Sequence, residues 1–194
     1  MSDPPKDGVI ADFWKMVIQS DVNLIGMVAN ISPEEACQYW PNIGDIYINF
    51  EDMITVETIS ESKPYGNAAG VVHRVFTVGF DGSYRTINHF QYVNWPDYGV
   101  PQNIQNFLFF LDGISGFDDG EKPTIIHCSA GVGRSGTAVA MATIRALLEK
   151  TIEVDPLEIV IELRKQRCGM VSTPEQFLLL CDFLTCIYAV AYNK

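Results

Sequence analysis

The stretch that decides the fold reads His127-Cys128-Ser129-Ala130-Gly131-Val132-Gly133-Arg134-Ser135-Gly136-Thr137. A short apolar run, residues 124–126, precedes it, and a helical pattern follows over residues 138–150. Three glycines allow the backbone to turn so that successive N–H groups point inward, and a helix behind them adds its positive dipole end. The pattern therefore predicts a site for a phosphate-sized dianion between a strand and a helix.

Two side chains of this loop turn an anion site into a candidate reaction site. Cys128 stands at the end of the predicted strand and faces the same N–H groups, an environment that favours a nucleophilic thiolate. Arg134 supplies a planar fork of donors that matches two oxygens of a phosphoryl group, which a lysine would meet only as a point charge. The sequence thus places a nucleophile and a clamp in one turn.

Other interpretations of the loop explain less of it. Gly131, Gly133 and Gly136 spell the G-x-G-x-x-G of dinucleotide-binding folds, with Glu153 near the expected ribose-binding position. That fold needs further β-α-β units, whereas the chain after residue 155 has helical patterns only. A Walker loop would need a lysine before Ser135. A buried structural cysteine would suffice for Cys128 alone, but not for its combination with an arginine and three glycines.

The loop closely resembles the signature of the cysteine-dependent protein tyrosine phosphatases, in their tyrosine-specific branch. Four further segments resemble landmarks of that family in the same order: residues 12–16 (DFWKM), 38–41 (QYWP), 95–101 (WPDYGVP) and 166–171 (QRCGMV). The resemblance implies an α/β (α+β) fold in which helices flank a central twisted mixed sheet. It further implies one N-terminally shortened catalytic domain over residues 8–194, preceded by a flexible tail over residues 1–7.

Residues 95–101 carry the candidate general acid. Two prolines stiffen the ends of this segment, Gly99 supplies a flexible point and large aromatic residues anchor it, so we expect a lid. A tyrosine oxygen, with a pKa of ~10, leaves slowly without protonation, and a positioned acid is worth ~10²–10⁴-fold. Asp97 is the candidate acid, and the resemblance assigns the matching aspartate that role, with Trp95 and Pro96 as supporting residues.

The resemblance also implies roles for the rest of the site. Ser135 would donate a hydrogen bond to the departing sulfur, and His127 would order the loop. Gln176 matches a glutamine of the family that helps hydrolysis, but Ser172 stands where a second glutamine is usual. We expect the substrate's phosphoryl group to contact the loop residues Ser129, Ala130, Gly131, Val132, Gly133 and Arg134.

Composition bounds the partners and the compartment. The chain has 194 residues, 47% of them hydrophobic, and a net charge of −11, which argues against nucleic acid or an anionic membrane as a partner. Its five cysteines are an odd number without zinc-type spacing, and a catalytic thiolate needs a reducing environment, so we expect a cytoplasmic protein. We expect a phosphotyrosine-containing protein or peptide as the partner, and neither a cofactor nor a metal ion.

Further patterns give expectations for the fold. Residues 46–90 alternate as antiparallel strands, with a hairpin turn at Asp81-Gly82, and helices are expected over residues 11–20, 102–115 and 138–150, and from residues 156 and 174. We expect residues 177–190 to form a core helix and not a membrane span, His73 and His89 to be structural, Glu34 and Glu35 to lie in a solvated turn, and the basic run 164–167 to serve a helix C-terminus.

Two other hypotheses remain open beside a tyrosine phosphatase. Relatives normally carry a substantial segment before the position of Asp12, including a tyrosine-bearing loop that deepens the phosphotyrosine pocket. Together with Ser172, this departure favours a phosphotyrosine-binding protein without turnover. The third hypothesis is an incomplete catalytic fragment that needs a further segment to fold.

Overall fold

A computed structural model describes residues 9–33, 35–49, 53–96, 99–150 and 153–192. Its centre is a 6-stranded sheet with the strand order β2-β3-β4-β5-β1-β6. The strands are β1 (Leu24–Met27), β2 (Ile46–Asn49), β3 (Ile54–Ser62), β4 (Val71–Phe80), β5 (Ser83–Tyr92) and β6 (Thr124–His127). β2 to β5 pair antiparallel, whereas β1 lies parallel between β5 and β6, so the sheet is mixed as expected.

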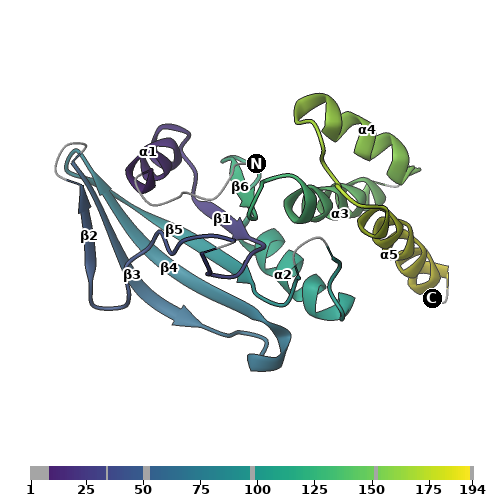
Figure 1. Cartoon of the computed structure of the whole chain (residues 1–194), viewed down its shortest axis with the longest axis horizontal. Coiled ribbons are helices and arrows are strands. Elements are labelled where there is room, and N and C mark those ends of the chain that lie inside the picture. The colour runs from purple at the N-terminus through teal and green to yellow at the C-terminus, as the bar shows by residue number, and fades with distance from the viewer. Residues whose placement is uncertain (1–8, 34, 50–52, 97–98, 151–152, 193–194) are drawn as a thin grey trace.

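Helices cover both faces of the sheet (Figure 1). They are α1 (Ile10–Gln19), α2 (Ile104–Phe117), α3 (Gly133–Glu149), α4 (Pro156–Gln166) and α5 (Pro174–Tyr192), with a short 3₁₀ turn over Asn67–Ala69. Successive strand residues point to opposite faces, and Leu24 and Ile25 accordingly belong to two different buried clusters. α1 packs in the Ile25 cluster, and α2 to α5 pack in the Leu24 cluster, so the expected helix-flanked sheet is confirmed.

Strand direction explains where a site can form. Because β1, β5 and β6 run parallel, their carboxyl ends lie at the same edge of the sheet. The described residues that follow them, 28–33 and 35, 93–96 and 99–101, and 128–132, therefore converge there, as ligand-binding loops do in sheets with parallel strands. Three stretches far apart in the sequence are thus brought to one place by topology.

Local signals in the sequence are confirmed at several element ends. Asp81 and Gly82 connect β4 to β5 with φ angles of +47° and +73°, as a tight hairpin requires. The Asp155 side chain caps α4 by accepting a hydrogen bond of 2.8 Å from the Leu157 backbone N–H. In the part of the chain that the structure describes, no helix is both long and apolar enough to cross a membrane.

Candidate active site

The predicted anion-binding loop, residues 128–132, which we call the phosphate loop, joins β6 to α3 as the sequence predicts. Val132 stands at the N-cap of α3, and its apolar side chain accepts no hydrogen bond, so the first N–H groups of the helix face the loop uncapped by it. Of the three glycines, only Gly131 has a positive φ, +67°. Gly133 and Gly136 lie inside α3, so the prediction that all three turn the backbone is wrong. Gly136 instead allows close packing, since a Cβ there would lie 2.8 Å from the Val171 nitrogen.

Cys128 lies at the base of a small pocket. Its side chain is buried, and its Sγ lies 3.4 Å from the Ser135 Oγ, which is within hydrogen-bonding distance for sulfur. The pocket has a volume of about 70 Å³, which suits a tetrahedral anion and not a dinucleotide. It is lined by Cys128, Ser129, Ala130, Val132, Gly133, Arg134, Ser172, Thr173 and Gln176.

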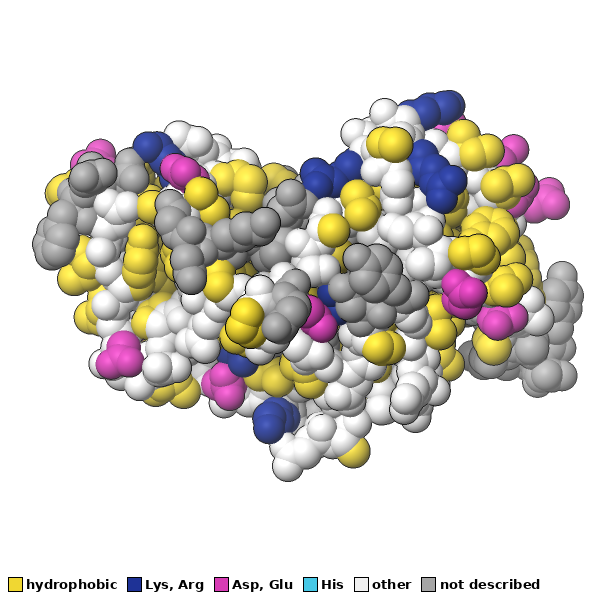
Figure 2. Space-filling model, viewed as in Figure 1, with side chains coloured by type: hydrophobic (Ala, Val, Ile, Leu, Met, Phe, Trp, Pro, Cys, Tyr) yellow, Lys and Arg dark blue, Asp and Glu magenta, His cyan; other side chains and the backbone are white. Residues whose placement is uncertain are grey.

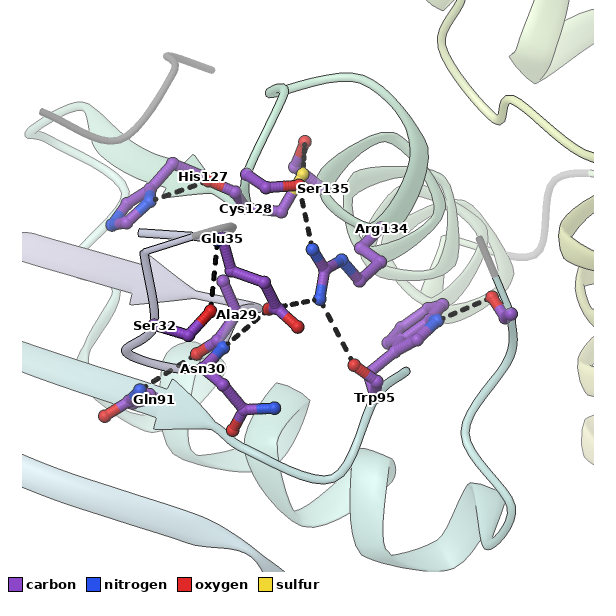
Figure 3. A network of polar contacts seen from close by, with 12 residues as sticks. Ala29, Asn30, Ser32, Glu35, Gln91, Trp95, His127, Cys128, Arg134 and Ser135 are labelled. Atoms are coloured by element: carbon purple, nitrogen blue, oxygen red, sulfur yellow. Dashed lines mark hydrogen bonds and ion pairs between the residues drawn. The ribbon is translucent and has the colours of Figure 1, made fainter. Parts of the chain in front are cut away.

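Arg134 reaches from the first turn of α3 toward the two neighbouring loops (Figure 3). Its Nη1 donates to the Glu35 Oε2 at 2.8 Å and to the Trp95 carbonyl at 3.2 Å, and its Nη2 donates to the Ser129 Oγ at 2.8 Å. Only 2% of the residue is exposed, so these contacts form in a setting of low solvent screening. The guanidinium plane is therefore fixed by partners from all three converging loops.

Glu35 corrects an expectation from the sequence. Its side chain is only 16% exposed, so the prediction of a solvated turn is wrong for this residue. Besides Arg134, its Oε2 accepts a hydrogen bond of 2.9 Å from the Asn30 N–H, and the Ser32 Oγ accepts one of 3.2 Å from the Glu35 N–H. These bonds fold the loop after β1 so that the carboxylate points inward (Figure 3). Glu34 lies outside the described residues.

The predicted lid is described only at its ends. Trp95 is 1% exposed, and its indole Nε1 donates to the Gly99 carbonyl at 2.8 Å. The Gly99 N–H in turn donates to the Pro96 carbonyl at 3.2 Å. The Trp95 end of the segment also contacts Arg134, through the Trp95 carbonyl. Asp97 and Tyr98 lie outside the described residues, so the role of Asp97 as the acid stays a prediction.

Gln176 also lines the pocket. Its Oε1 accepts a hydrogen bond of 2.9 Å from the Ser172 N–H, and its Nε2 donates to the Gly99 carbonyl at 3.4 Å. The Ser172 Oγ donates to the Gly169 carbonyl at 3.0 Å, within its own loop. Gln176 therefore links the Ser172 loop to the predicted lid segment, while the hydroxyl of Ser172 is engaged within its own loop.

The basic run ends α4, with Arg164 and Lys165 in its last turn and Arg167 at its C-cap, so that prediction is confirmed, and two of its arginines also support these loops. Arg164 donates to the Met170 carbonyl at 2.9 Å and to the Val171 carbonyl at 2.8 Å, both beyond α4. Val171 has a φ of +58°, which is costly for a β-branched residue, so these bonds offset local strain. Arg167 donates to the Ala130 carbonyl of the phosphate loop at 3.4 Å. The sequence carried no pattern that distinguished these roles.

His127 lies beneath the loop and contacts it through the backbone. Its Nδ1 lies 3.4 Å from the Cys128 carbonyl oxygen, and its Nε2 lies 2.7 Å from the hydroxyl of Tyr39. Burial lowers the pKa of His127 to about 4, so the ring is neutral at neutral pH. Burial also raises the pKa of Tyr39 well above its usual value. Tyr39 was not predicted as a site residue, although it lies in the segment 38–41 that carried the family resemblance.

The chemistry that this geometry supports is nucleophilic attack on a bound oxyanion. A buried thiol, a hydroxyl, the start of a helix and a fixed guanidinium surround one small pocket, which is how a tetrahedral anion is held beside a nucleophile. Across the described ranges, no cluster of three or more His, Cys, Asp or Glu side chains could hold a metal ion. The positive charge of the pocket comes from Arg134 and the N–H groups of α3.

Curated tyrosine-protein phosphatases are similar to this chain in sequence. It is 33% identical over 198 residues to tyrosine-protein phosphatase non-receptor type 2 of Rattus norvegicus. The matched region covers 98% of this chain and 46% of that protein. It is 34% identical over 193 residues to tyrosine-protein phosphatase 2 of Dictyostelium discoideum, covering 89% of the chain and 47% of that protein. The chain thus spans about half the length of the curated relatives it matches.

Solved structures agree with this result. The catalytic domain of human protein tyrosine phosphatase non-receptor type 18 superposes with a TM-score of 0.88 at 25% identity, over 96% of this chain and 68% of that one. A complex of the same phosphatase with HER2 phospho-peptides gives a TM-score of 0.86 at 25% identity, over 96% and 65%. The family model described as protein-tyrosine phosphatase matches residues 1–186. This chain belongs to the protein-tyrosine phosphatase family.

Proposed function

We propose that this protein hydrolyses phosphotyrosine in other proteins through a phosphocysteine intermediate and without a metal ion. The observation that carries the proposal is the position of Cys128, whose buried Sγ lies 3.4 Å from the Ser135 Oγ at the start of α3, in the pocket that Arg134 lines. A nucleophile, an anion site and a donor for the nucleophile's sulfur then lie together, as covalent phosphoryl transfer requires.

In the first step the Cys128 thiolate attacks phosphorus in line with the departing tyrosine oxygen. The sulfur–phosphorus bond forms as the bond from phosphorus to the tyrosine oxygen breaks, and Asp97 gives its proton to that oxygen. Arg134 and the loop N–H groups hold the equatorial oxygens, whose charge grows in the transition state. The contacts of Arg134 with Glu35 and Trp95 fix the guanidinium plane before substrate arrives.

In the second step water attacks the phosphocysteine and releases inorganic phosphate. Asp97 accepts a proton from the water, and the Ser135 hydroxyl donates a hydrogen bond to the sulfur as it leaves. Gln176 is the amide that lines the pocket here and is the candidate to orient the water. Because Ser172 is short and its hydroxyl bonds to Gly169, we expect it to contribute little to this step.

The surface around the site suits an anionic substrate in spite of the net charge of −11. Lys and Arg side chains gather over α4 on the face shown in Figure 2. Arg167, just beyond α4, contacts the phosphate loop itself. The similar human phosphatase binds HER2 phospho-peptides, which supports a phosphotyrosine peptide as the substrate of this chain. A local basic surface can concentrate such substrates where the overall field repels them.

The proposal includes removal of phosphate from signalling proteins in the cytoplasm. All five cysteines are free thiols, which accords with a reducing compartment. A catalytic thiolate is the group that oxidants attack first, so the proposed chemistry requires such a compartment.

Rapid mixing with p-nitrophenyl phosphate in the presence of a chelator tests the proposal. We expect a burst of p-nitrophenol equal to the concentration of sites, followed by slower steady turnover. The Cys128→Ser variant, which keeps the shape of the side chain but not the thiolate, should show neither phase. Absence of release from wild-type protein that melts cooperatively would contradict the proposal.

A second candidate function is phosphotyrosine binding without turnover. The observation that favours it is the side of the pocket formed by Ser172, where the hydroxyl is bonded within its own loop. For such a protein we expect saturable binding of a phosphotyrosine peptide, and either no burst or a burst with no later turnover. Steady release of phosphate after the burst would exclude it.

A further inference from the structure

Three buried side chains form a hydrogen-bonded chain beneath the phosphate loop. The Tyr39 hydroxyl lies 2.9 Å from the His89 Nε2 and 2.7 Å from the His127 Nε2. Exposure is 1% for Tyr39 and 0% for both histidines. His127 ends β6 and His89 lies in β5, on the face of the sheet that α1 covers. The proposed mechanism assigns no task to His89.

The position of each proton in this chain follows from the partners. The His127 Nδ1 lies 3.4 Å from the Cys128 carbonyl oxygen, and a carbonyl can only accept, so Nδ1 carries the ring proton of His127. The Nε2 of a neutral His127 then holds a lone pair and accepts the hydrogen of the Tyr39 hydroxyl. Since that hydroxyl has one hydrogen, its contact with His89 must be one in which the His89 Nε2–H donates.

The environment of His89 agrees with this assignment. Its Nδ1 is buried and, among the described residues, has no hydrogen-bond partner. An unpaired nitrogen lone pair at this place is less costly than an unpaired N–H, which buried structures rarely leave unsatisfied. Burial above all, with Arg74, His127 and His73 nearby, lowers the pKa of His89 well below its usual value, so the ring is neutral and has one proton to place.

We propose that His89 is a positioning residue for the reaction at Cys128, acting through Tyr39 and His127. Its Nε2–H donates to the Tyr39 oxygen and directs the hydrogen of Tyr39 to His127, and His127 then holds the Cys128 carbonyl. This keeps the negative end of that carbonyl bound to an N–H and away from the thiolate. Hydrogen bonds in such a series strengthen one another, so the donor at the far end affects the last bond.

The inference rests on the proposed function, because it concerns the thiolate that attacks phosphorus, but its tests need no turnover. Long-range proton–nitrogen NMR of the wild-type protein reports which ring nitrogen of each histidine is protonated. We expect His89 to be protonated at Nε2 and His127 at Nδ1. A His89 ring protonated at Nδ1 would overturn the proposal, whatever the activity of the protein.

A second test follows the thiolate by its rate of alkylation with iodoacetamide as the pH is varied. His89→Leu removes the donor. We expect the pH midpoint of Cys128 alkylation in this variant to rise by about half a pH unit, which corresponds to a fraction of the free energy of one hydrogen bond. The matched control is His73→Leu, since His73 lies on the adjacent strand β4 and bonds to Asn88. That control should keep the wild-type midpoint.

The Tyr39→Phe background separates transmission through the hydroxyl from a general structural effect. Tyr39→Phe should itself raise the midpoint, and adding His89→Leu should then cause no further shift. An unchanged midpoint in His89→Leu, or an equal shift in both backgrounds, would overturn the proposal. If a variant does not fold, the NMR result on the wild-type protein still decides the question.

Discussion

Two groups of residues at the phosphate pocket are held by different interactions. One group, which we call the arginine wall, consists of the lining residue Arg134 and its hydrogen-bond partners Glu35 and Trp95, and is held by a buried ion pair of 2.8 Å. The other, the glutamine wall, consists of Ser172, Thr173 and Gln176 and is held by neutral hydrogen bonds of 2.9 to 3.4 Å. Charged hydrogen bonds are roughly twice as strong as neutral ones.

This difference indicates how the two proposed steps depend on the site. Formation of the phosphocysteine concentrates charge on phosphoryl oxygens, which the arginine wall can stabilise. Its hydrolysis depends on placing one neutral water, which is the task that we propose for the glutamine wall. Changes in the arginine wall should therefore reduce the burst, and changes in the glutamine wall should alter the turnover that follows it.

The largest effect is expected from Arg134→Lys. Lysine keeps the charge but loses the fork that contacts Glu35, Trp95 and Ser129 together. We expect the burst rate to fall by about 10²–10³-fold, as for loss of a transition-state donor. Stopped-flow release of p-nitrophenol measures it, with a thermal melt as the control for folding. A burst rate near that of wild type would mean that the fork of Arg134 does not stabilise the transition state of the first step.

Glu35→Gln tests whether the carboxylate positions Arg134. The amide keeps the shape of the side chain but not its charge, and we expect the burst to slow by about tenfold, in line with a weakened hydrogen bond to a charged group. Glu61→Gln is the matched control, because Glu61 forms a similar ion pair of 2.7 Å with Arg74. Equal slowing in both variants would mean that the effect is general and not specific to the pocket.

Ser172→Gln tests the glutamine wall with a gain instead of a loss. A longer amide at this position could share the placement of water with Gln176. We expect steady turnover to rise about threefold while the burst rate stays unchanged, a smaller effect than that of an acid or base. Single-turnover release of inorganic phosphate measures the second step alone. No gain in that step would show that Gln176 is sufficient.

The smallest effect concerns the pH dependence of the free energy of unfolding, which the buried rings of His127 and His89 influence. Burial lowers the pKa of His127 to about 4 and lowers that of His89 well below its usual value, so unfolding takes up protons at both rings. Their contribution to stability is complete above a pH of ~6.5, the unfolded value, and is lost as the pH falls toward the folded value. The free energy of unfolding should therefore decrease between about pH 6.5 and 4.

His89→Leu provides the check, since it removes one of these groups. Near pH 5 the slope of the unfolding free energy against pH should fall by about 1.4 kcal/mol per pH unit, the value for one proton. Urea titrations at a series of pH values measure the slope. A slope equal to that of wild type would mean that the His89 ring is already protonated in the folded protein.

Local sequence signals were sufficient for the phosphate loop and for most element ends. The apolar run, the glycines and the helix after them lie within one short stretch, so the pattern of residues alone was enough to place Cys128 and Arg134 together between a strand and a helix. Asp155 and the Asp81-Gly82 turn likewise act through near neighbours in the chain. Interactions between near neighbours in the chain can therefore be predicted from the sequence.

The contacts that position the site could not be predicted, because they join distant segments. The Arg134–Glu35 pair depends on β1 lying beside β6, and strand order is set by long-range packing that no local pattern records. A glutamate in a turn looks solvated until its partner is known. The contact between Arg167 and Ala130 and the series through Tyr39 and His89 follow from the same topology.

Acid-quenched mixing of the protein with a phosphotyrosine peptide labelled in its phosphate tests the central claim most directly. We expect label to appear on Cys128 within the burst, located by mass spectrometry of the digested protein, and to decay at the rate of steady turnover. Cys128→Ser should carry no label under the same conditions. If the wild-type protein releases phosphate from the peptide and no labelled Cys128 is found at times that cover the burst, the phosphocysteine mechanism is contradicted.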